Sequence, residues 1–473
     1  MNSLKRQPIL CLQNHSQNNL DLFKEFTQNE MISRMNRTVL ICAGVFVVSS
    51  CAAQQRSVGK TEITKWQFGK RGAVSITYDD GTINQFRKAL PIMNNLRIPA
   101  TFFINTGQIS GSQYMGAFIG RPVKTIIEET ATIPTNTDNF FERSSAAGFL
   151  GLNGTLEYHI KAGEQFDEGS PEKAYKIIDE LFEKVRLGYF TSSGSAEDGL
   201  HETDVTTWDE IRIYAAQGHE FASHMVTHPY LAALDEVNIL YELEKSREEI
   251  FNQLGLKYTF SAEVPFGTEN ERALEYAYKV YPALRNRMPE LYLEELNRGN
   301  SENPRSAEME YVQWQRGATT KTSLSLMKSW IDTTSVNDNI WLVLVFHGVD
   351  GIGWEALASN LLEEYFKYMK SNENNLWIAT FGDVTRYMRE RMNSIIKTEK
   401  KGRKITVNII NTLDPTIYSI PLTLKTYVPS KWKEVQVKEG SEKRIIRPQY
   451  DMRGSYILYQ VIPNTGKIEV TRI

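Results

Sequence analysis

The stretch Ala73–Gly81, AVSITYDDG, decides how this chain folds. Its first six residues form an apolar, β-rich run, which predicts a buried strand. Two carboxylates, Asp79 and Asp80, follow directly, and the chain then turns through Gly81. Because side chains alternate along a strand, adjacent carboxylates at its end can reach one pocket from different sides. An Asx turn, in which these carboxylates only bond the backbone, is the simpler interpretation.

Other β-rich runs follow the first one along the chain and alternate with helical patterns. The runs are TFFIN at 101–105, HEFASH at 219–224, YTFSAEV at 258–264, WLVLVFH at 341–347 and LWIATF at 376–381. Apolar residues at spacings of three and four predict helices over 82–96, 206–218, 235–255 and 355–371. Alternating strands and helices predict a parallel sheet or barrel with its active loops at the carboxyl ends of the strands.

Two segments fall outside this alternation. The long gap between the second and third runs predicts an insertion at about 110–205, with a helix of its own at 171–190. It could be a lid, a substrate wall or a packing decoration. Beyond Lys397 short alternating runs separated by Pro, Gly and Asn predict a small antiparallel β-sandwich at 400–473. Its basic excess could contact an anionic glycan or a membrane surface, or could simply be solvated.

The composition limits the classes of function. The chain has 473 residues, 41% hydrophobic content and a net charge of -3, which is enough for two folded units and argues against nucleic acid as the main partner. The cysteines are Cys11, Cys42 and Cys51. A metal site in the remainder of the chain must therefore use histidines and carboxylates.

The amino-terminal region predicts export. Residues 35–53 combine an arginine, an apolar run and small residues, the build of a secretory signal. Val48–Cys51, VSSC, resembles a lipoprotein signal, so we expect an exported bacterial lipoprotein, periplasmic or at the cell surface, that meets the membrane only through a lipid anchor at Cys51. Cleavage after Ala53 by an ordinary signal peptidase is the alternative. Residues 1–34 are expected to be an extension from an upstream start codon, and 66–396 the barrel.

Three of the seven histidines end β-rich segments or follow them closely. His224 and His228 lie in GHEFASHMVTHP, and His347 ends the most apolar run. Two histidines four residues apart are often incidental, and a single one is often a core residue. Three at one barrel mouth with two aspartates fit a metal site of two histidines and a carboxylate with an open position.

Four motifs in this order resemble the polysaccharide deacetylase family, the NodB-type deacetylases: TYDDG at 77–81, SHMVTHP at 223–229, VPFG at 264–267 and VLVFH at 343–347. The resemblance covers about 66–392 without the insertion. It implies an α/β fold, an incomplete or distorted (β/α) barrel, to which the β-sandwich is added.

The resemblance also implies roles for particular residues. Asp80, His224 and His228 would hold a divalent metal, most often Zn²⁺, while Asp79 would be the general base and His347 the general acid. Pro265 and Phe266 of the third motif are expected to contact substrate. Asp350 and Trp354 follow His347 closely enough to line the same mouth, or else belong to a loop and helix start.

Two departures from the family pattern affect these roles. Met225 stands where the family has Ser or Thr, and Glu263 stands where the family has the arginine that steadies the base. Arg285, Arg287 or Arg316 could replace that arginine from another loop. The family's Asp-Trp motif has only loose counterparts, Trp314 and Asp332.

Three functions remain open from the sequence. The first is metal-dependent hydrolysis of an N- or O-acetyl group on an acetylated glycan. The second is glycan binding without turnover, suggested by Glu263 and the basic tail. The third is hydrolysis of an amide that is not part of a sugar.

Overall fold

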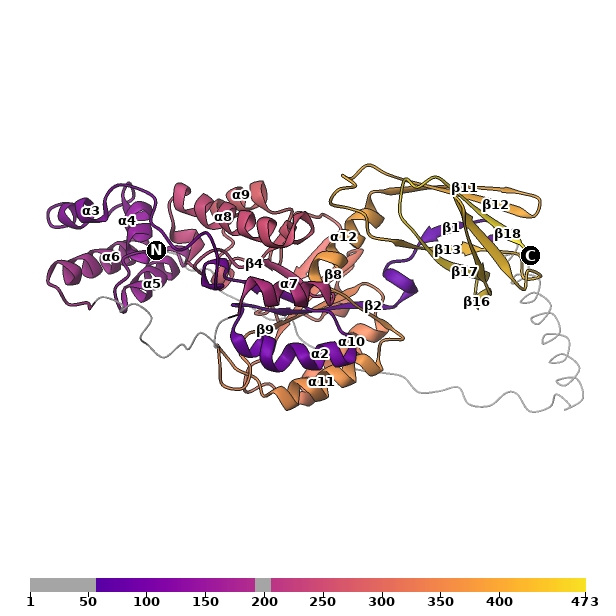
Figure 1. Cartoon of the computed structure of the whole chain (residues 1–473), viewed down its shortest axis with the longest axis horizontal. Helices are drawn as coiled ribbons and strands as arrows, with labels where there is room; N and C mark the ends of the chain where they lie inside the picture. Colours follow the sequence, from indigo (N-terminus) through magenta and orange to yellow (C-terminus); the bar gives the residue numbers. More distant parts are fainter. Residues whose placement is uncertain (1–56, 192–205) are drawn as a thin grey trace, which may run out of the picture.

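The computed structural model describes residues 57–191 and 206–473. Within them the chain is elongated, with a helical insertion at one end, a barrel in the middle and a β-sandwich at the other end (Figure 1). The predicted extension, the signal segment and Cys51 lie outside the described residues. Among those residues no helix combines the length and apolarity that crossing a membrane requires.

The central sheet confirms the predicted distorted (β/α) barrel. In spatial order it runs β6-β5-β4-β3-β2-β9-β8-β7, with β10 beside the first half of β2, and every pair is parallel. The described residues contain no pairing between the end strands β6 and β7, so the barrel is open. The strands are β2 (Gly72–Tyr78), β3 (Thr101–Ile104), β4 (Glu220–Ser223), β5 (Ser261–Ala262), β6 (Ala283–Leu284), β7 (Leu293–Leu296), β8 (Tyr311–Gly317), β9 (Ile340–Phe346) and β10 (Leu376–Ile378).

Both faces of the sheet are covered. Along β2 and β9 alternate side chains enter two separate cores, one under the outer helices and one that includes α12, on the side of the barrel next to the sandwich (Figure 1). This explains why the two strands are buried along their whole length. The outer helices are α2 (Leu90–Leu96) with the helical turn η2 (Gln85–Ala89), α7 (Trp208–Ala216), α8 (Glu236–Leu254), α9 (Glu271–Val280), α10 (Leu324–Val336) and α11 (Ser359–Ser371), and the inner helix is α12 (Phe381–Met392).

Local sequence sets where the helices begin. Thr207 accepts a hydrogen bond from Glu210 N–H, and the Glu210 side chain accepts from Thr207 N–H, a capping box that starts α7. Asp235 accepts from Asn238 N–H and Asn270 from Ala273 N–H, which caps α8 and α9. These two caps follow the loops that carry His228 and Phe266, so they fix where those loops end.

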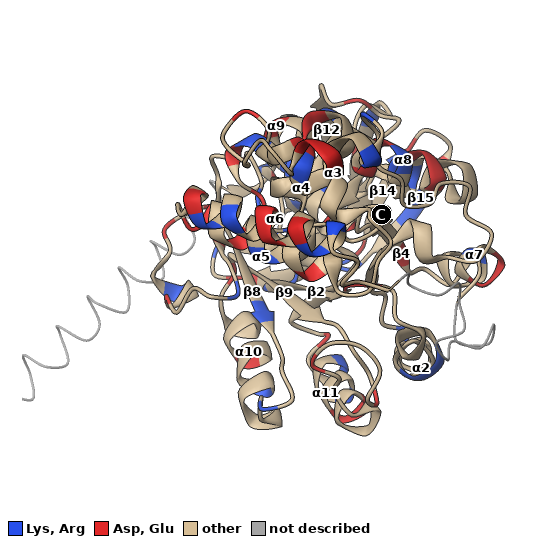
Figure 2. Cartoon of the chain, turned by 90° about the vertical axis from the view of Figure 1, so that its left-hand side faces the viewer, with Lys and Arg blue, Asp and Glu red and all other residues tan. Residues whose placement is uncertain are grey.

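The region between β3 and α7 forms a helical unit with its own hydrophobic core. Its helices are α3 (Val123–Glu129), α4 (Phe140–Gly148), α5 (Thr155–Asp167) and α6 (Pro171–Arg186). Lys, Arg, Asp and Glu are mixed over these helices rather than gathered by sign (Figure 2). We call α3 to α6 the helical insertion.

The carboxyl-terminal part is an antiparallel sandwich of two sheets around one apolar core. Its strands are β1 (Thr61–Ile63), β11 (Ser394–Lys401), β12 (Lys404–Asn411), β13 (Leu422–Tyr427), β14 (Val435–Glu439), β15 (Glu442–Ile446), β16 (Gln449–Asp451), β17 (Gly454–Val461) and β18 (Lys467–Arg472). The expected start at residue 400 is too late, because β11 already pairs with β12 from Ser394. The segment before the barrel also belongs to the sandwich, since β1 pairs with β13.

Candidate active site

Asp79 and His347 stand next to each other at the mouth of the barrel. The inward-facing positions of β2 and β9 are the odd-numbered ones, such as Ala73 and Trp341. Asp79 and His347 continue these two series past the strand ends, and Asp79 N–H donates to Phe346 O at 3.0 Å. The His347 Nε2 atom lies 3.4 Å from Asp79 Oδ2. The register of two neighbouring strands therefore brings both predicted acid–base residues together.

Gln85 fixes the two strand ends relative to each other. This buried side chain donates through Nε2 to the carbonyl oxygens of Asp79, at 2.5 Å, and His347, at 2.9 Å. Sequence reasoning missed Gln85, since a glutamine in the first turn of a helix gives no signal of such a role.

Asp80, His224 and His228 converge beside this pair. Asp80 Oδ1 lies 3.5 Å from His224 Nε2 and 3.3 Å from His228 Nε2. Donors at 2.0–2.1 Å from a tetrahedral ion stand about 3.4 Å apart, so both separations suit a shared cation. The three ligand atoms form one of two groups in the described residues with metal-binding spacing; the other joins Asp79, His224 and Glu263.

The backbone that presents these ligands is unusual. Asp80, Met225 and His228 have φ values of 75°, 67° and 67°, in the left-handed region that residues with a Cβ avoid. Such conformations cost about 1–3 kcal/mol each and persist only where the surroundings impose them. On the side of α8, the buried Glu242 carboxylate accepts from Val226 N–H at 2.7 Å and Thr227 N–H at 3.0 Å. Glu242 thus fixes the turn between His224 and His228.

Glu263 determines which nitrogen of His224 faces Asp80. The His224 Nδ1–H group donates to Glu263 O at 2.9 Å and lies 2.8 Å from Glu263 Oε2. This leaves Nε2 facing Asp80, and Nε2 is the nitrogen that a metal would occupy in place of its proton. Burial alone would lower the pKa of His224, yet the carboxylates of Glu263 and Asp80 raise it well above its ordinary value. The position therefore favours a positive charge.

Arg285 takes the place of the arginine missing at Glu263. It follows β6, faces the barrel interior and contacts both oxygens of Asp79, at 2.5 Å from Nη1 and 2.7 Å from Nη2. The Nη2 atom also lies 2.8 Å from Glu263 Oε1. The other candidates lie elsewhere: Arg316 donates to Asn300 O, and Arg287 is exposed. Of the three arginines left open by the sequence, the structure selects Arg285.

The buried charges form one chain from Asp79 through Arg285 and Glu263 to His224. We call these four residues the buried network. Asp79, Arg285 and Glu263 are at most 2% exposed. Gln313 and Gln315 of β8 donate to Arg285 O and hold this residue from the opposite edge of the barrel. Sequence reasoning missed both glutamines, although their alternation with Val312 and Trp314 would fit inward-facing strand positions.

The surroundings of the site also shift the pKa values of Asp80 and His347. Burial opposes ionisation of Asp80, but hydrogen bonds and charge from His224 and His228 lower its pKa well below the usual range. Burial lowers the pKa of His347, against the opposing effect of Asp79 and Asp80. Asp80 is therefore an anion at neutral pH, and His347 gives up its proton more readily than an exposed histidine does.

Aromatic side chains flank the site on both sides. Phe266 is 47% exposed, with its ring centroid 4.7 Å from that of His228. Trp354 is 59% exposed and meets the ring of His347 edge to face, also at 4.7 Å. Pro265 is buried beneath Phe266 in the turn η7 (Pro265–Gly267). Asp350 is directed elsewhere: its Oδ1 accepts from Ser359 N–H at 2.7 Å, at the start of α11.

Several other polar residues of the barrel lie away from the site. His219 and Glu220 begin β4 at its far end, where Glu220 accepts from Thr101, Gly382 and Ser261. Asp332 accepts from Tyr368 OH, and Trp314 is buried on β8. Neither forms the family's Asp-Trp arrangement in the contacts of the described residues.

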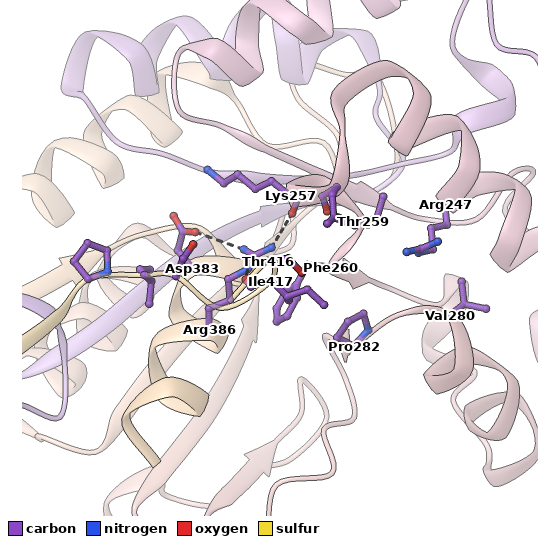
Figure 3. Close-up of a pocket in the computed structure, with 14 residues that line it drawn as sticks. Arg247, Lys257, Thr259, Phe260, Val280, Pro282, Asp383, Arg386, Thr416 and Ile417 are labelled. Atoms are coloured by element: carbon purple, nitrogen blue, oxygen red, sulfur yellow. Dashed lines mark hydrogen bonds and ion pairs between the residues drawn. The ribbon is translucent and has the colours of Figure 1, made fainter. Parts of the chain in front are cut away.

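A separate cavity of about 470 Å³ lies on the other side of the barrel, near the sandwich (Figure 3). Its lining includes Arg247, Lys257 and Phe260 from the segment before β5, Arg386 of α12, and Ile417. The Arg386 guanidinium donates to Ile417 O, in the loop between β12 and β13, and to Lys257 O, in the segment before β5. It thereby joins the sandwich to the barrel. None of the site residues lines this cavity.

The chain is similar in sequence and fold to several known proteins. Residues 68–131 and 163–281 match the family model described as polysaccharide deacetylase. A gellan lyase from Bacillus sp is 24% identical over 280 residues, 55% of this chain, and the chain spans only 11% of that relative. Among solved structures, the chitin deacetylase of Colletotrichum lindemuthianum is 15% identical, with a TM-score of 0.32 and coverage of 69% of this chain and 92% of that one. A peptidoglycan N-acetylglucosamine deacetylase is 12% identical, with a TM-score of 0.32 and coverage of 66% and 87%.

Proposed function

The barrel of this chain belongs to the polysaccharide deacetylase family, and on that premise we propose that the protein hydrolyses acetyl groups from an acetylated glycan with the help of a divalent metal. The observation that carries this proposal is the contact of both Asp79 oxygens with Arg285, beside His347 and the cluster of Asp80, His224 and His228. A base, an acid and a cation site within one mouth suit hydrolysis by an activated water.

Asp80, His224 and His228 are the residues proposed to hold the metal. Their donor set, one carboxylate and two imidazoles, suits Zn²⁺ and leaves a coordination position open. When bound, such a cation supplies Lewis acidity, which lowers the pKa of a water toward neutrality and polarises the acetyl carbonyl. The fixed tautomer of His224 and the ionised state of Asp80 support this assignment.

The proposed role of Asp79 is to take a proton from the attacking water. Two hydrogen bonds from Arg285 fix both carboxylate oxygens of this buried group. This also answers why two carboxylates stand side by side in the sequence. Asp80 would coordinate the cation, while Asp79 would remain free to accept a proton.

His347 is proposed to protonate the leaving nitrogen or oxygen. Its Nε2 atom is 3.4 Å from Asp79 Oδ2, so the acid and the base flank the same space. Burial lowers the pKa of His347, and an acid whose pKa lies near or below the working pH releases its proton easily to a departing amine or alkoxide.

Phe266 and Trp354 are proposed to contact the sugar, since both rings are half exposed and border the catalytic groups. Asp350 is a weaker candidate because one carboxylate oxygen is engaged by α11. The binding-only alternative was suggested by Glu263 and by the basic tail, and Arg285 answers the first of these by supplying the arginine to Asp79. The lyase activity in the name of the Bacillus relative is not part of the proposal, since this chain matches 11% of that protein.

Export and lipid anchoring at Cys51 also remain proposals, supported by the sequence pattern of residues 35–53. They would place the barrel where envelope or external glycans are met. Labelling cells with a radioactive fatty acid tests the anchor: the wild-type chain should be labelled, and Cys51→Ala should not.

Acetate release tests the proposed reaction. The purified protein, loaded with Zn²⁺, is incubated with N-acetylated and O-acetylated oligosaccharides and with simple non-sugar acetamides. We expect acetate from at least one glycan, loss of release on chelation and recovery on adding Zn²⁺. Release from acetamides alone would favour the non-sugar amidase, and glycan binding without release would favour the binding protein.

A further inference from the structure

The helical insertion contacts the very loop that carries His228. Its helices α4 and α5 lie against the segment from Pro229 to Asp235, which continues from the second proposed metal ligand. In Figure 1 the insertion adjoins the end of the barrel near α8 and α9. His228 holds a left-handed φ of 67° that its own sequence does not favour, so its backbone depends on such contacts.

His159 of α5 is the first link in this contact. It is fully buried and accepts from Tyr230 N–H through Nε2 at 3.2 Å, while Nδ1 lies 3.0 Å from Ser144 O of α4. The imidazole is therefore neutral, with its proton on Nδ1 and the lone pair of Nε2 directed at Tyr230 N–H, in the loop that carries His228. A buried histidine that uses both nitrogens between two segments fixes their separation.

Tyr230 is the residue through which the insertion reaches the loop. Besides the bond from its N–H group, its hydroxyl donates to Asp167 Oδ2 at 3.1 Å. Its ring packs so closely on Gly163 that a Cβ there would lie 2.4 Å from the ring. Only Pro229 separates Tyr230 from His228, so the position of Tyr230 limits the backbone of the ligand.

Asp167 joins a second loop to the first. Its Oδ1 accepts from Asn270 Nδ2 at 3.0 Å, and Asn270 caps α9 directly after the turn that carries Phe266. The rings of Tyr230 and Phe266 stack at 5.8 Å between centroids. One carboxylate of the insertion thus holds both loops that form this side of the site.

We propose that the helical insertion is a built-in support of the metal centre, in which His159 and Asp167 are positioning residues that fix His228 through Tyr230. This inference rests on the proposed function only for the identity of the metal ligands. It assigns the insertion a task that neither a lid nor a packing decoration would have. Glu242 holds the loop from the barrel side, and the insertion holds it from the other.

Metal affinity tests the proposal without any substrate. Zn²⁺ affinity is measured by competition with a chromogenic chelator, and the visible spectrum of the Co²⁺-loaded protein reports ligand geometry. His159→Leu removes the acceptor for Tyr230 N–H and is expected to weaken Zn²⁺ binding about 10- to 100-fold, the usual effect of losing a residue that orients a ligand. His159→Gln, which keeps an acceptor near Nε2, should restore most of the affinity.

A matched control separates positioning from general stability. Ile178→Val shortens a buried side chain in the core of the insertion, away from the metal loop. It should lower the Tm and leave both Zn²⁺ affinity and the Co²⁺ spectrum unchanged. If His159→Leu does not fold, Tyr230→Phe, which only loses the bond to Asp167, should still weaken Zn²⁺ binding several-fold.

Equal Zn²⁺ affinity and an equal Co²⁺ spectrum in wild type and His159→Leu, or in Tyr230→Phe where that variant replaces it, would overturn the proposal. An affinity loss in Ile178→Val as large as that of His159→Leu would overturn it too. Failure of the proposed function gives a different result: the wild-type protein would bind Zn²⁺ but release no acetate, and the metal measurements would stand by themselves.

Discussion

Two arginine–carboxylate contacts in this molecule have similar geometry and opposite surroundings. Arg285 contacts both oxygens of Asp79 inside the barrel mouth, where both side chains are at most 2% exposed. Arg453 contacts both oxygens of Glu62 in the sandwich, where the two side chains are 48% and 31% exposed. The same chemical pair therefore occurs once without water and once in contact with it.

The difference teaches what each pair does. Water already solvates Arg453 and Glu62, so their contact contributes little. In the barrel the charges have lost their water, and each depends on the others for stabilisation. Apolar side chains at these positions would cost less free energy on folding. We therefore interpret the role of the buried network as fixing Asp79 and His224 in position. The rest of the barrel offsets the loss in stability.

The largest expected effect concerns activity. Asp79→Asn keeps the size of the side chain and removes the base, so acetate release should fall about 10²- to 10⁴-fold. Asp451→Asn makes the same change in the sandwich, where Asp451 accepts from Lys425 and Tyr427. That variant should leave the rate unchanged. Initial rates of acetate release by both variants measure the contrast, and an Asp79→Asn enzyme at wild-type rate would remove Asp79 from the mechanism.

The second effect concerns stability. Arg285→Met leaves Asp79 and Glu263 buried without their cation, which should lower the free energy of unfolding by about 3–5 kcal/mol. Urea denaturation of the metal-free variant and wild type, followed by tryptophan fluorescence, measures the loss. A decrease below about 1 kcal/mol would mean that water reaches the network, and the contrast with the exposed pair would disappear.

The third effect is a pH dependence of the stability of the barrel. Burial lowers the pKa of His219 to about 4, from about 6.5 in the unfolded chain. Between pH 4 and pH 6.5 the unfolded state therefore binds more protons than the folded state. The free energy of unfolding keeps its full contribution from neutral His219 above about pH 6.5 and loses it as the pH falls toward 4. At pH 4.5 this histidine should account for roughly 2–3 kcal/mol of lost stability.

Urea denaturation at pH 7 and pH 4.5 measures that loss. His219→Asn, whose amide oxygen can still accept from Ala100 N–H as Nδ1 does, is the control and should lose less stability over the same interval. Identical pH dependence in the variant and wild type would show that His219 is not the titrating group.

The smallest effect belongs to the exposed pair. Arg453→Met should change the free energy of unfolding by at most about 1 kcal/mol, and less at high salt. The measurement is the same denaturation at low and high ionic strength. A loss as large as that of Arg285→Met would show that exposure does not distinguish the two contacts.

Much of the fold and part of the site could be predicted from the sequence, because they depend on local patterns. Strands β2 and β9 are continuous apolar runs, and their alternation already directs Asp79 and His347 inward. Strands β7 and β8 escaped notice because inward-facing polar residues, such as Gln313 and Gln315, interrupt their apolar character. The run at 258–264 was too long as a strand, since only Ser261–Ala262 pairs.

The remainder of the site depends on contacts between distant segments. Arg285 was one of three arginines that the sequence left open; it follows a strand of two residues, and nothing in its neighbourhood singles it out as the partner of Asp79. The same holds for Gln85 and His159, which contact His347 and Tyr230 far away in the sequence, and for Glu242, which contacts the backbone of Val226 across the turn before α8. A side chain that serves another residue's backbone leaves no spacing pattern, so only the tertiary structure reveals it.

A crystal structure of the Zn²⁺-loaded protein, with the ion located by its anomalous scattering, tests the central claim most directly. The account predicts one Zn²⁺ at about 2.0–2.2 Å from a carboxylate oxygen of Asp80 and from Nε2 of His224 and His228, with Asp79 still held by Arg285 and outside the coordination sphere. An ion bound by Asp79 and Glu263, or no ion in the barrel mouth, would contradict it.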